Sequence, residues 1–382
     1  MVSTLSTLLL RALVCVLIVT ANTAFSSQSI RVTFIVPTAQ GDMFWDTFVS
    51  FMSAAADDLG IELDVHHNES GNRFGEMEIA ERLLKAETKP DFLLTQVKRN
   101  SFEKILELSA KARVPYFTVN TKPTPEAAGA VGKPREKYPH WLGQIIPDDF
   151  QAGYEVAELL IREARRSGLA FPHEHIQMVA ISGGRDSSAA LDRNDGLMKA
   201  VSQHQDVALK QTVFSEWNTA VAAELAQRLL ARHPRTTVVW SASDGIALGV
   251  IDAANASGML PGKRLLTAGI DWSTQGIAAV ASGQMLATFG AHFMEGAWAL
   301  VLLHDYYHGK DFADIAGTQI AASFHAITRE NLDQLRLMTE PENFPKVDFR
   351  AFSRIYHPDL THYHFGIEAV LEQLKFGLTQ AE

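Results

Sequence analysis

The chain has 382 residues, and its 34 basic and 44 acidic side chains give a formal net charge of −10. This acidic balance argues against a nucleic-acid or anionic-membrane partner, because either would require a basic face. Hydrophobic residues make up 47% of the chain and charged residues 20%, which is typical of a soluble globular protein, and the length predicts two domains.

The N-terminal segment 1–26 differs in kind from the rest of the chain. It contains no acidic residue, a single basic residue, Arg11, and an apolar run at 12–19 that ends before the small-x-small pattern at 24–26. This composition predicts a secretory signal peptide, and the alternative, a membrane anchor, would require a longer apolar run. The only cysteine, Cys15, lies in this segment, so a mature chain would have no thiol for a disulfide, a metal site or a nucleophile. We expect a periplasmic protein.

Strands and helices alternate along the first half of the chain. Predicted strands lie at 30–37, 61–65, 91–95 and 115–120, and predicted helices at 44–59, 76–86 and 101–113. Strict alternation of this kind predicts a parallel sheet with helices on both faces. Residues 121–140 contain four prolines and show no period, so they are predicted to form a surface loop.

The same alternation restarts after a predicted strand at 141–146 and a possible crossover at 147–149. Predicted strands follow at 176–181, 207–214, 237–240, 265–270 and 285–289, and predicted helices at 150–166, 187–203, 219–231, 245–255 and 293–307. The chain is therefore predicted to form two similar α/β lobes. After residue 330 the pattern indicates two helices, at 331–338 and 365–374, with a loop at 341–362 between them.

Polar and aromatic side chains follow the ends of successive predicted strands. The candidate ligand residues are Asp42, Phe44, Trp45, Asn120, Arg193, Trp217, Asp244 and Asp271. Ligands of open α/β sheets lie beyond the carboxyl ends of the strands, so these side chains are expected to converge. Carboxylates accept protons from hydroxyl groups, and an arginine and an amide donate in return. With aromatic faces to cover the C–H face of a ring, the set predicts a sugar-like ligand.

Each candidate also has a purely structural alternative. The three aspartates lie where helices begin and could act as caps, and the tryptophans could pack in a hinge or a core. Arg193 could be an ordinary solvated helix residue. His304 and His308 have metal-ligand spacing, but the first histidine is not followed by a glutamate and the helix is otherwise apolar. With no phosphate loop and no nucleophile elbow, we predict no catalytic residue, metal or cofactor.

The chain resembles the type I periplasmic substrate-binding proteins, in the branch of ribose- and galactose-binding proteins, over most of residues 30–310. The most specific segments are 187–196, 243–249 and 267–271. The resemblance implies two doubly wound parallel-sheet lobes joined by a three-segment hinge, with crossings near residues 147, 291 and 322. The lobes would be 27–147 with 292–322, and 148–291 with 323–382.

The resemblance also implies roles for single residues. Asp42, Phe44 and Trp45 would face the ligand from the first lobe, and Arg193, Trp217 and Asp271 from the second. Thr121 follows Asn120 where the family often has an aspartate followed by an arginine, so that clamp is missing. Ser243 replaces a usual asparagine, which makes Asp244 the safer match. His292 is expected to take the place of a family glutamine near residue 291.

We therefore expect a non-enzymatic periplasmic solute-binding protein. It would capture a small polyhydroxylated ligand in the cleft between the lobes and present the closed form to an ABC permease or a sensor kinase. The long tail after about residue 330 slightly favours sensing. The alternative is an exported α/β enzyme that acts on a carbohydrate with Asp244 and Asp271. A transcription regulator of this fold would need an N-terminal DNA-binding unit where the predicted signal peptide lies.

Overall fold

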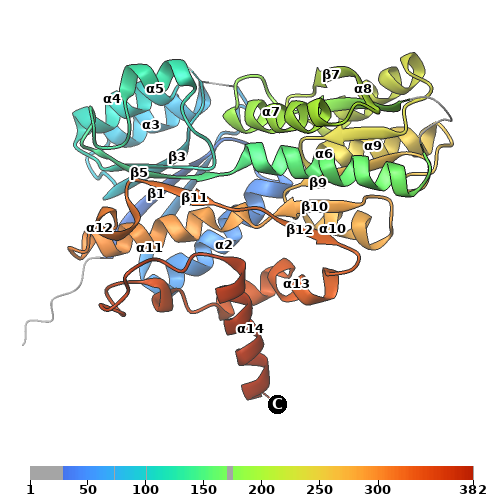
Figure 1. The fold of residues 1–382 in the computed structure, drawn as a ribbon. Coiled ribbons are helices and arrows are strands. Elements are labelled where there is room, and N and C mark those ends of the chain that lie inside the picture. Colours follow the sequence, from blue (N-terminus) through green and yellow to red (C-terminus); the bar gives the residue numbers. More distant parts are fainter. Residues whose placement is uncertain (1–28, 73, 100, 170–174, 382) are drawn as a thin grey trace, which may run out of the picture.

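The computed structural model describes residues 29–72, 74–99, 101–169 and 175–381, with side chains up to residue 377. The signal-peptide prediction and Cys15 lie outside these residues. The described chain forms two six-stranded sheets, ordered β11-β5-β4-β3-β1-β2 and β12-β10-β9-β8-β6-β7, which lie side by side in Figure 1. All strand pairs are parallel except β10 with β12. The predicted class of two parallel-sheet α/β lobes is confirmed.

The first lobe is built on the sheet that contains β1. Its strands are β1 (Ile30–Val36), β2 (Ile61–His67), β3 (Phe92–Gln96), β4 (Tyr116–Val119), β5 (Trp141–Pro147) and β11 (Gln319–Ala322). Its helices are α2 (Met43–Leu59), α3 (Gly75–Lys85), α4 (Phe102–Ala112), α5 (Pro125–Val131), α11 (Glu295–Tyr307) and α12 (Ala313–Ala316), and the short 3-10 helix η1 (His292–Met294) precedes α11.

The second lobe repeats this arrangement around β6. Its strands are β6 (Ile176–Ser182), β7 (Val207–Phe214), β8 (Val238–Ser241), β9 (Leu266–Ile270), β10 (Ala287–Gly290) and β12 (His325–Thr328). Its helices are α6 (Asp149–Arg166), α7 (Ser188–Gln203), α8 (Thr219–Arg232), α9 (Asp244–Ala256) and α10 (Thr274–Ala281). The chain passes between the sheets after β5, after β10 and between β11 and β12.

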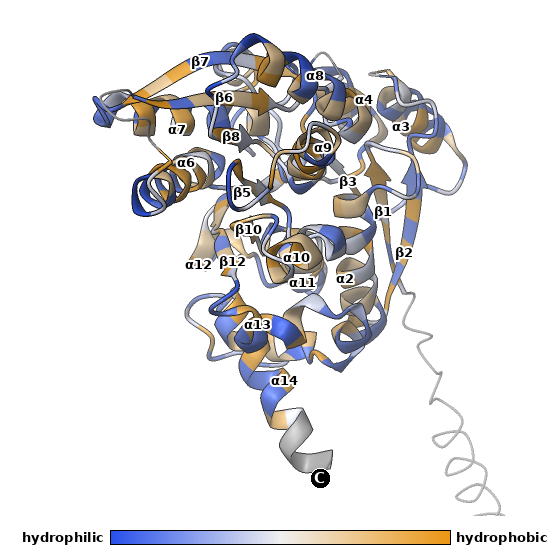
Figure 2. Cartoon of the chain, turned by 90° about the vertical axis from the view of Figure 1, so that its right-hand side faces the viewer, coloured by the Kyte–Doolittle hydropathy of each residue, from blue (hydrophilic) through white to orange (hydrophobic). Residues whose placement is uncertain are grey.

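The central strands are apolar on both faces because helices cover both. Val32, Phe34 and Val36 of β1 are fully buried, as are Val238 and Val239 of β8. Figure 2 shows the same division, with hydrophobic strands inside and hydrophilic colour on the outer sides of the helices. Burial on both faces explains why these strands read as continuous apolar runs in the sequence.

Helix α2 carries the first part of the site, and its start and end are well defined. The Asp42 side chain caps its N-terminus by accepting from the backbone N–H groups of Phe44 and Trp45, each at 3.0 Å. Gly60 ends the helix in the left-handed conformation, at φ 68°. Helix α11 packs closely against α2 at Gly296. A Cβ at this position would lie 2.5 Å from the ring of Phe48 on α2.

Several stretches differ from the sequence-based expectation, including β11 and β12, which were not predicted. The predicted loop at 121–140 contains α5, which Thr124 caps and which begins with Pro125 at the first helical position. Helix α10 was not predicted, and it follows the turn at Asp271 by only a few residues. Both helices are short, so neither has enough turns to show a hydrophobic period.

The tail after residue 330 packs on the first lobe, although the sequence analysis assigned it to the second. It contains α13 (Leu332–Thr339), the 3-10 helices η2 (Pro341–Lys346) and η3 (Phe349–Phe352), and α14 (Ile367–Ala381), which extends away from the body in Figure 1. Phe344 and Phe349 are buried against Phe51 of α2, with ring centroids 5.0 and 5.2 Å away. The tail packs there because α2 presents aromatic side chains on its outer face, and burying them away from water is favourable. No described helix is long and apolar enough to span a membrane.

Candidate functional site

Arg193 lies at the centre of the cluster that the strand-end turns form. Its side chain is buried, its Nε donates to Asp149 Oδ1 at 2.7 Å, and its Nη1 donates to the carbonyl oxygen of Ala242 at 2.7 Å. The sequence allows this depth because α6 and α7 are in close contact, and a Cβ on Gly153 would lie 2.0 Å from the Arg193 carbonyl oxygen. The alternative of a solvated helix arginine is therefore wrong.

Asp149 is the buried partner of Arg193 and was not among the predicted residues. Burial raises the pKa of its carboxyl from 3.8 to about 6, while the charge and hydrogen bond of Arg193 act in the opposite direction. The guanidinium is held in one orientation, because its Nε donates to Asp149 and its Nη1 donates to the carbonyl oxygen of Ala242.

Aromatic rings connect this arginine to the first lobe. The guanidinium carbon lies 5.7 Å from the ring centroid of Trp217 and 5.6 Å from that of Phe324. Phe324 in turn lies 4.6 Å from the ring of His292, which stacks on Phe44 of α2 at 4.4 Å with an interplanar angle of 18°. A continuous row of rings thus runs from the first lobe to Arg193 of the second.

Trp217 owes its position to an unusual turn. Glu216 and Trp217 both have left-handed backbones, at φ 51° and 63°, immediately before α8. The indole ring lies against Gly183, where a Cβ would come within 2.2 Å of it. The glycine pair after β6 is therefore required to admit the ring, which is left 37% exposed and available for a contact.

Asp271 and His292 form a second pair, in which His292 is buried and Asp271 is partly buried. Asp271 follows β9 with φ 140°, and its Oδ1 lies 3.8 Å from His292 Nε2. Burial raises the pKa of Asp271 well above its usual value, and the charge of Asp244 adds to this effect. Burial and the charge of Arg193 lower the pKa of His292 well below its usual value, so this imidazole is neutral at pH 7.

Asn120 ends β4 in the left-handed conformation, at φ 69°. Its backbone N–H donates to Glu295 Oε2 at 2.8 Å and to the carbonyl oxygen of Ile145 at 3.1 Å. Glu295, at the start of α11, is fully buried, and burial raises its pKa well above the usual value, with the charge of Asp149 adding to the shift. Its Oε1 has no hydrogen-bond partner among the described residues, so it can accept from a bound molecule or water.

The structure brings most of the predicted residues to one place at the junction of the lobes. Those that lie there are Asp42, Phe44, Asn120, Arg193, Trp217, Asp271 and His292. Asp42 both caps α2 and reaches the cluster, since its charge contributes to the raised pKa of Asp271, after burial and the charge of Asp244. Capping and a place in the cluster are therefore compatible for Asp42.

Trp45 and Asp244 have structural positions instead. Trp45 is buried in the core of the first lobe, between the rings of Phe34 and Phe48 at 6.1 and 5.1 Å. Asp244 is fully buried, and its Oδ2 accepts from the backbone N–H and the hydroxyl of Ser273, at 2.9 and 2.8 Å. It joins α9 to the start of α10, so both residues have structural roles in this arrangement.

Three residues of the cluster were missed by the sequence analysis. They are Asp149, Phe324 and Glu295. The sequence did offer an indication for Asp149, because it follows a strand and is the first residue of α6, one position after the capping residue Asp148. Glu295 is an acid at the start of an otherwise apolar helix, which is a pattern that marks a buried polar group. Phe324 lies in a segment without periodicity and had no signal.

The weak metal signal at His304 and His308 has a structural explanation. His304 is buried beside Asp305, with Nδ1 3.6 Å from Asp305 Oδ1, and its ring stacks over Tyr356 of the tail. Among the described residues there is no group of three or more His, Cys, Asp or Glu side chains that could hold a metal ion.

Comparison with known proteins relates this arrangement to one family. The family model described as periplasmic binding protein domain matches residues 32–311. The ribose import binding protein of Bacillus subtilis is 25% identical over 191 residues, which cover 48% of this chain and 58% of that protein. The chain thus spans little more than half the length of this relative.

Two solved structures extend the comparison. A periplasmic sugar-binding protein from Pseudomonas fluorescens has a TM-score of 0.81 and 33% sequence identity, and the match covers 90% of this chain and 99% of that one. A periplasmic solute-binding protein of an ABC transporter from Actinobacillus succinogenes, solved with D-allose, has a TM-score of 0.69 and 18% identity, covering 80% and 99% of the two chains. The second likeness concerns the fold alone.

Proposed function

Since the chain belongs to the family of periplasmic binding protein domains, we propose that it captures a small polyhydroxylated ligand of the sugar class between its two lobes. The observation that carries this proposal is the convergence of Arg193 and Asp271 from one lobe with Asp42 and Phe44 from the other. A ligand that bridges such groups stabilises the closed arrangement over the open one.

The chemistry of the cluster favours hydroxyl groups. Asp42, Asp271 and Glu295 supply acceptors, Arg193 supplies charged donors, and neutral His292 can donate or accept. The rings of Phe44 and Trp217 can cover the C–H face of a sugar. Buried polar groups left unpaired are costly, so a ligand without matching hydroxyl groups is rejected.

A binding role accounts for the acids better than a glycosidase role. The alternative enzyme would act on a carbohydrate with Asp244 and Asp271. Asp244, however, is fully buried and already accepts two hydrogen bonds from Ser273. Its Oδ2 holds the start of α10, which favours a structural role over a catalytic one beside Asp271. We take the protein to be a binding protein that works in the periplasm, with the predicted signal peptide directing its export.

The relatives also indicate which membrane protein would recognise the closed form. The relatives named above are import and ABC-transporter binding proteins, which supports an ABC permease as the reader of the closed form. A sensor kinase is the second candidate, and the tail, which adds α13 and α14 to the surface beside α2, is the feature that supports it.

Thermal-shift measurements with a panel of sugars that includes D-ribose and D-allose test the proposal. A ligand that binds only the folded form raises the melting temperature, and it should be recovered unchanged. The wild type should respond to at least one sugar, and Asp271→Asn and Arg193→Lys should not. Arg228→Lys, on the exposed face of α8, is the matched control and should respond as the wild type does. Turnover of the sugar, or equal responses of all variants, would contradict the proposal.

A further inference from the structure

Lys122 joins the two lobes directly, beside the proposed ligand site. It lies two residues after Asn120, at the end of β4 in the first lobe. Its backbone N–H donates to Ser188 Oγ at 3.0 Å, and its Nζ lies 2.5 Å from Asp192 Oδ2. Ser188 and Asp192 both belong to α7 of the second lobe, so one residue makes two polar contacts across the junction.

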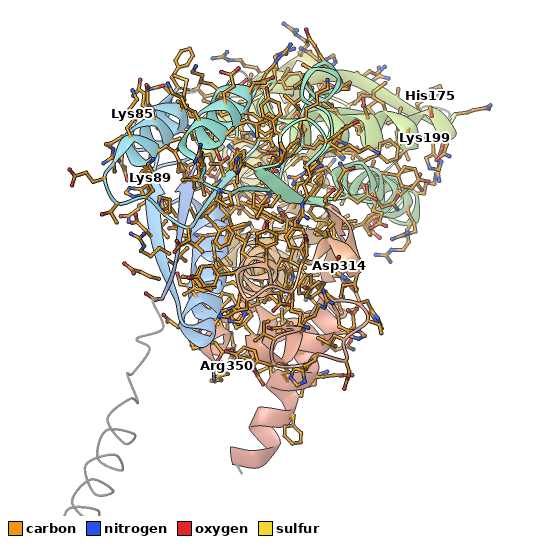
Figure 3. All side chains as sticks on the ribbon, turned by 90° about the vertical axis from the view of Figure 1, so that its left-hand side faces the viewer. Lys85, Lys89, His175, Lys199, Asp314 and Arg350 are labelled. Carbon is orange, nitrogen blue, oxygen red and sulfur yellow. The ribbon has the colours of Figure 1, made fainter. Side chains whose placement is uncertain are left out.

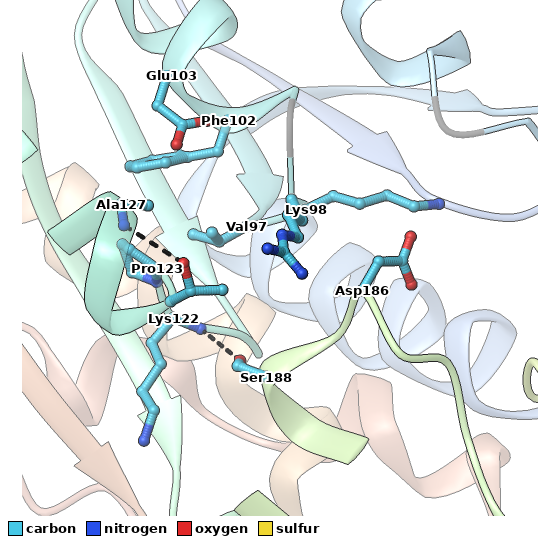
Figure 4. Close-up of a pocket in the computed structure, with 11 residues that line it drawn as sticks. Val97, Lys98, Phe102, Glu103, Lys122, Pro123, Ala127, Asp186 and Ser188 are labelled. Carbon is cyan, nitrogen blue, oxygen red and sulfur yellow. Dashed lines mark hydrogen bonds between the residues drawn. The ribbon is translucent and has the colours of Figure 1, made fainter. Parts of the chain in front are cut away.

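The contacts lie where the lobes nearly touch. The cavity between them at this point has a volume of about 10 Å³, which is room for about one water molecule. Figure 4 shows Lys98 and Lys122 on the first-lobe side of this cavity and Asp186 and Ser188 on the second-lobe side. Cationic side chains from one lobe thus face acidic and hydroxyl side chains from the other.

The same residues are adjacent to the groups that hold the ligand. Asp192 immediately precedes Arg193 on α7, and Lys122 is close in sequence to Asn120. After burial and Arg193, the charges of Asp192 and Lys122 have the next largest influence on the pKa of Asp149. Any movement that separates Lys122 from Asp192 therefore also separates the two halves of the site.

We propose that Lys122, Ser188 and Asp192 form an interlobe latch that holds the protein closed and sets how fast the ligand leaves. The latch residues are positioning residues. The inference rests on the proposed function only for its effect on the ligand, because the effect on closure needs no ligand. An ion pair of partly exposed groups has a modest strength, so the latch biases closure without locking it.

Closure is measured by the distance between spin labels on the two lobes in protein without ligand. Suitable positions are Lys85→Cys on α3 and Lys199→Cys on α7, which are both exposed and lie on different lobes (Figure 3), in a chain with Cys15→Ser. The wild-type distance distribution should contain a closed population. Lys122→Met or Asp192→Asn should lower the closed-to-open ratio about two- to fivefold, and the difference should shrink at high ionic strength.

Exchanging the charges separates a latch from a structural role. Asp192→Lys alone should lower the ratio further than Asp192→Asn, because two cations then face each other. Adding Lys122→Asp should recover most of the loss. The matched control is Lys104→Met, which removes an ion pair with Glu107 within α4 of the first lobe. This variant should leave the closed-to-open ratio unchanged. A wild type with no closed population, or a distribution that Asp192→Asn leaves unchanged, would overturn the proposal.

Dissociation of the sugar found by thermal shift gives the second readout. Asp192→Asn should raise its dissociation rate about two- to fivefold while the ranking of sugars stays the same. If no sugar binds but the label distances respond, the latch stands and the proposed ligand class fails. If a sugar binds and the distances do not respond, the ligand class stands and the latch fails.

Discussion

Arg193 and Asp149 are almost inaccessible to solvent, at 3% and 2% exposure, and each is the other's main charged partner. Removing one charge of such a pair leaves the other buried without compensation, which costs about 3–5 kcal/mol. We expect Arg193→Met to lower the free energy of unfolding in urea by that amount. Adding Asp149→Asn should recover much of it, because the stranded charge is then removed. A single variant as stable as the wild type would contradict this description of the pair.

Glu76 predicts a specific dependence of stability on pH. It is fully buried on α3, 3.8 Å from Lys98 Nζ, and burial raises its pKa from 4.5 to about 7. The folded protein therefore holds this proton more tightly than the unfolded chain. The resulting stability is complete below pH 4.5 and is lost as the pH rises through about 7.

Urea unfolding at low and high pH tests this assignment. Relative to Glu76→Gln, the wild type should lose on the order of 3 kcal/mol of stability as the pH rises across that window. Glu78→Gln, which removes an exposed carboxyl from the same helix, should keep the wild-type dependence. Equal pH profiles for wild type and Glu76→Gln would contradict the assignment.

At the scale of elements, the turn between β6 and α7 decides where the indole of Trp217 lies. A Cβ on Gly183 would come within 2.2 Å of this ring, so Gly183→Ala should push the indole away from Arg193. We expect the affinity for the sugar to fall about tenfold, as one aromatic contact worth about 1 kcal/mol or more is lost. Titration calorimetry measures the affinity for the sugar, and tryptophan fluorescence reports whether the environment of the Trp217 indole has changed.

A second glycine supplies the control for this variant. Gly129 lies in α5, and a Cβ there would meet nothing within 4 Å. Gly129→Ala should leave the affinity unchanged and raise stability slightly, because alanine is the better helix residue. If Gly183→Ala binds the sugar as tightly as Gly129→Ala does, the ring is not part of the site.

The tail is fixed to α11 through one carboxylate. Asp305 is buried and accepts from the Ser353 hydroxyl, from the backbone N–H of Arg354 at 2.8 Å and from the Tyr363 hydroxyl at 2.9 Å. Asp305→Ala should leave these donors unpaired and cost about 2 kcal/mol or more of stability. Hydrogen exchange should accelerate across residues 341–366, and exposed Asp252→Ala should have no such effect. Unchanged exchange in the tail would show that the aromatic contacts alone fix it.

At the scale of the whole molecule, the features that the sequence predicts are those that depend on hydrophobic periodicity. The two lobes and most strands follow from apolar runs alternating with amphipathic helices, and the convergence of strand ends follows from a parallel sheet. Asp42 and Asp271 were predicted in this way, whereas Arg193 lies in the second turn of α7. The predictions reached residues on strand-end turns because these turns meet at one edge of each sheet.

The remaining features depend on contacts that a single sequence does not show. Asp244 and Asp271 lie in equivalent turns, and only the position of Ser273 shows that the Asp244 carboxylate holds the start of α10 in place. Trp45 is next to Phe44 in sequence, but the helix turns it toward the core. Residues 341–362 of the tail have no period, so the packing of this segment on α2 follows only from which surface is left uncovered.

The most direct test of the central claim is a crystal structure of the protein saturated with D-ribose or D-allose, whichever raises its melting temperature more. The account predicts a sugar between the lobes, with hydroxyl groups within hydrogen-bond distance of Arg193 and Asp271 and a ring face against Phe44 or Trp217. A sugar bound on the outer surface of one lobe, with Arg193 and Asp271 untouched, would contradict it.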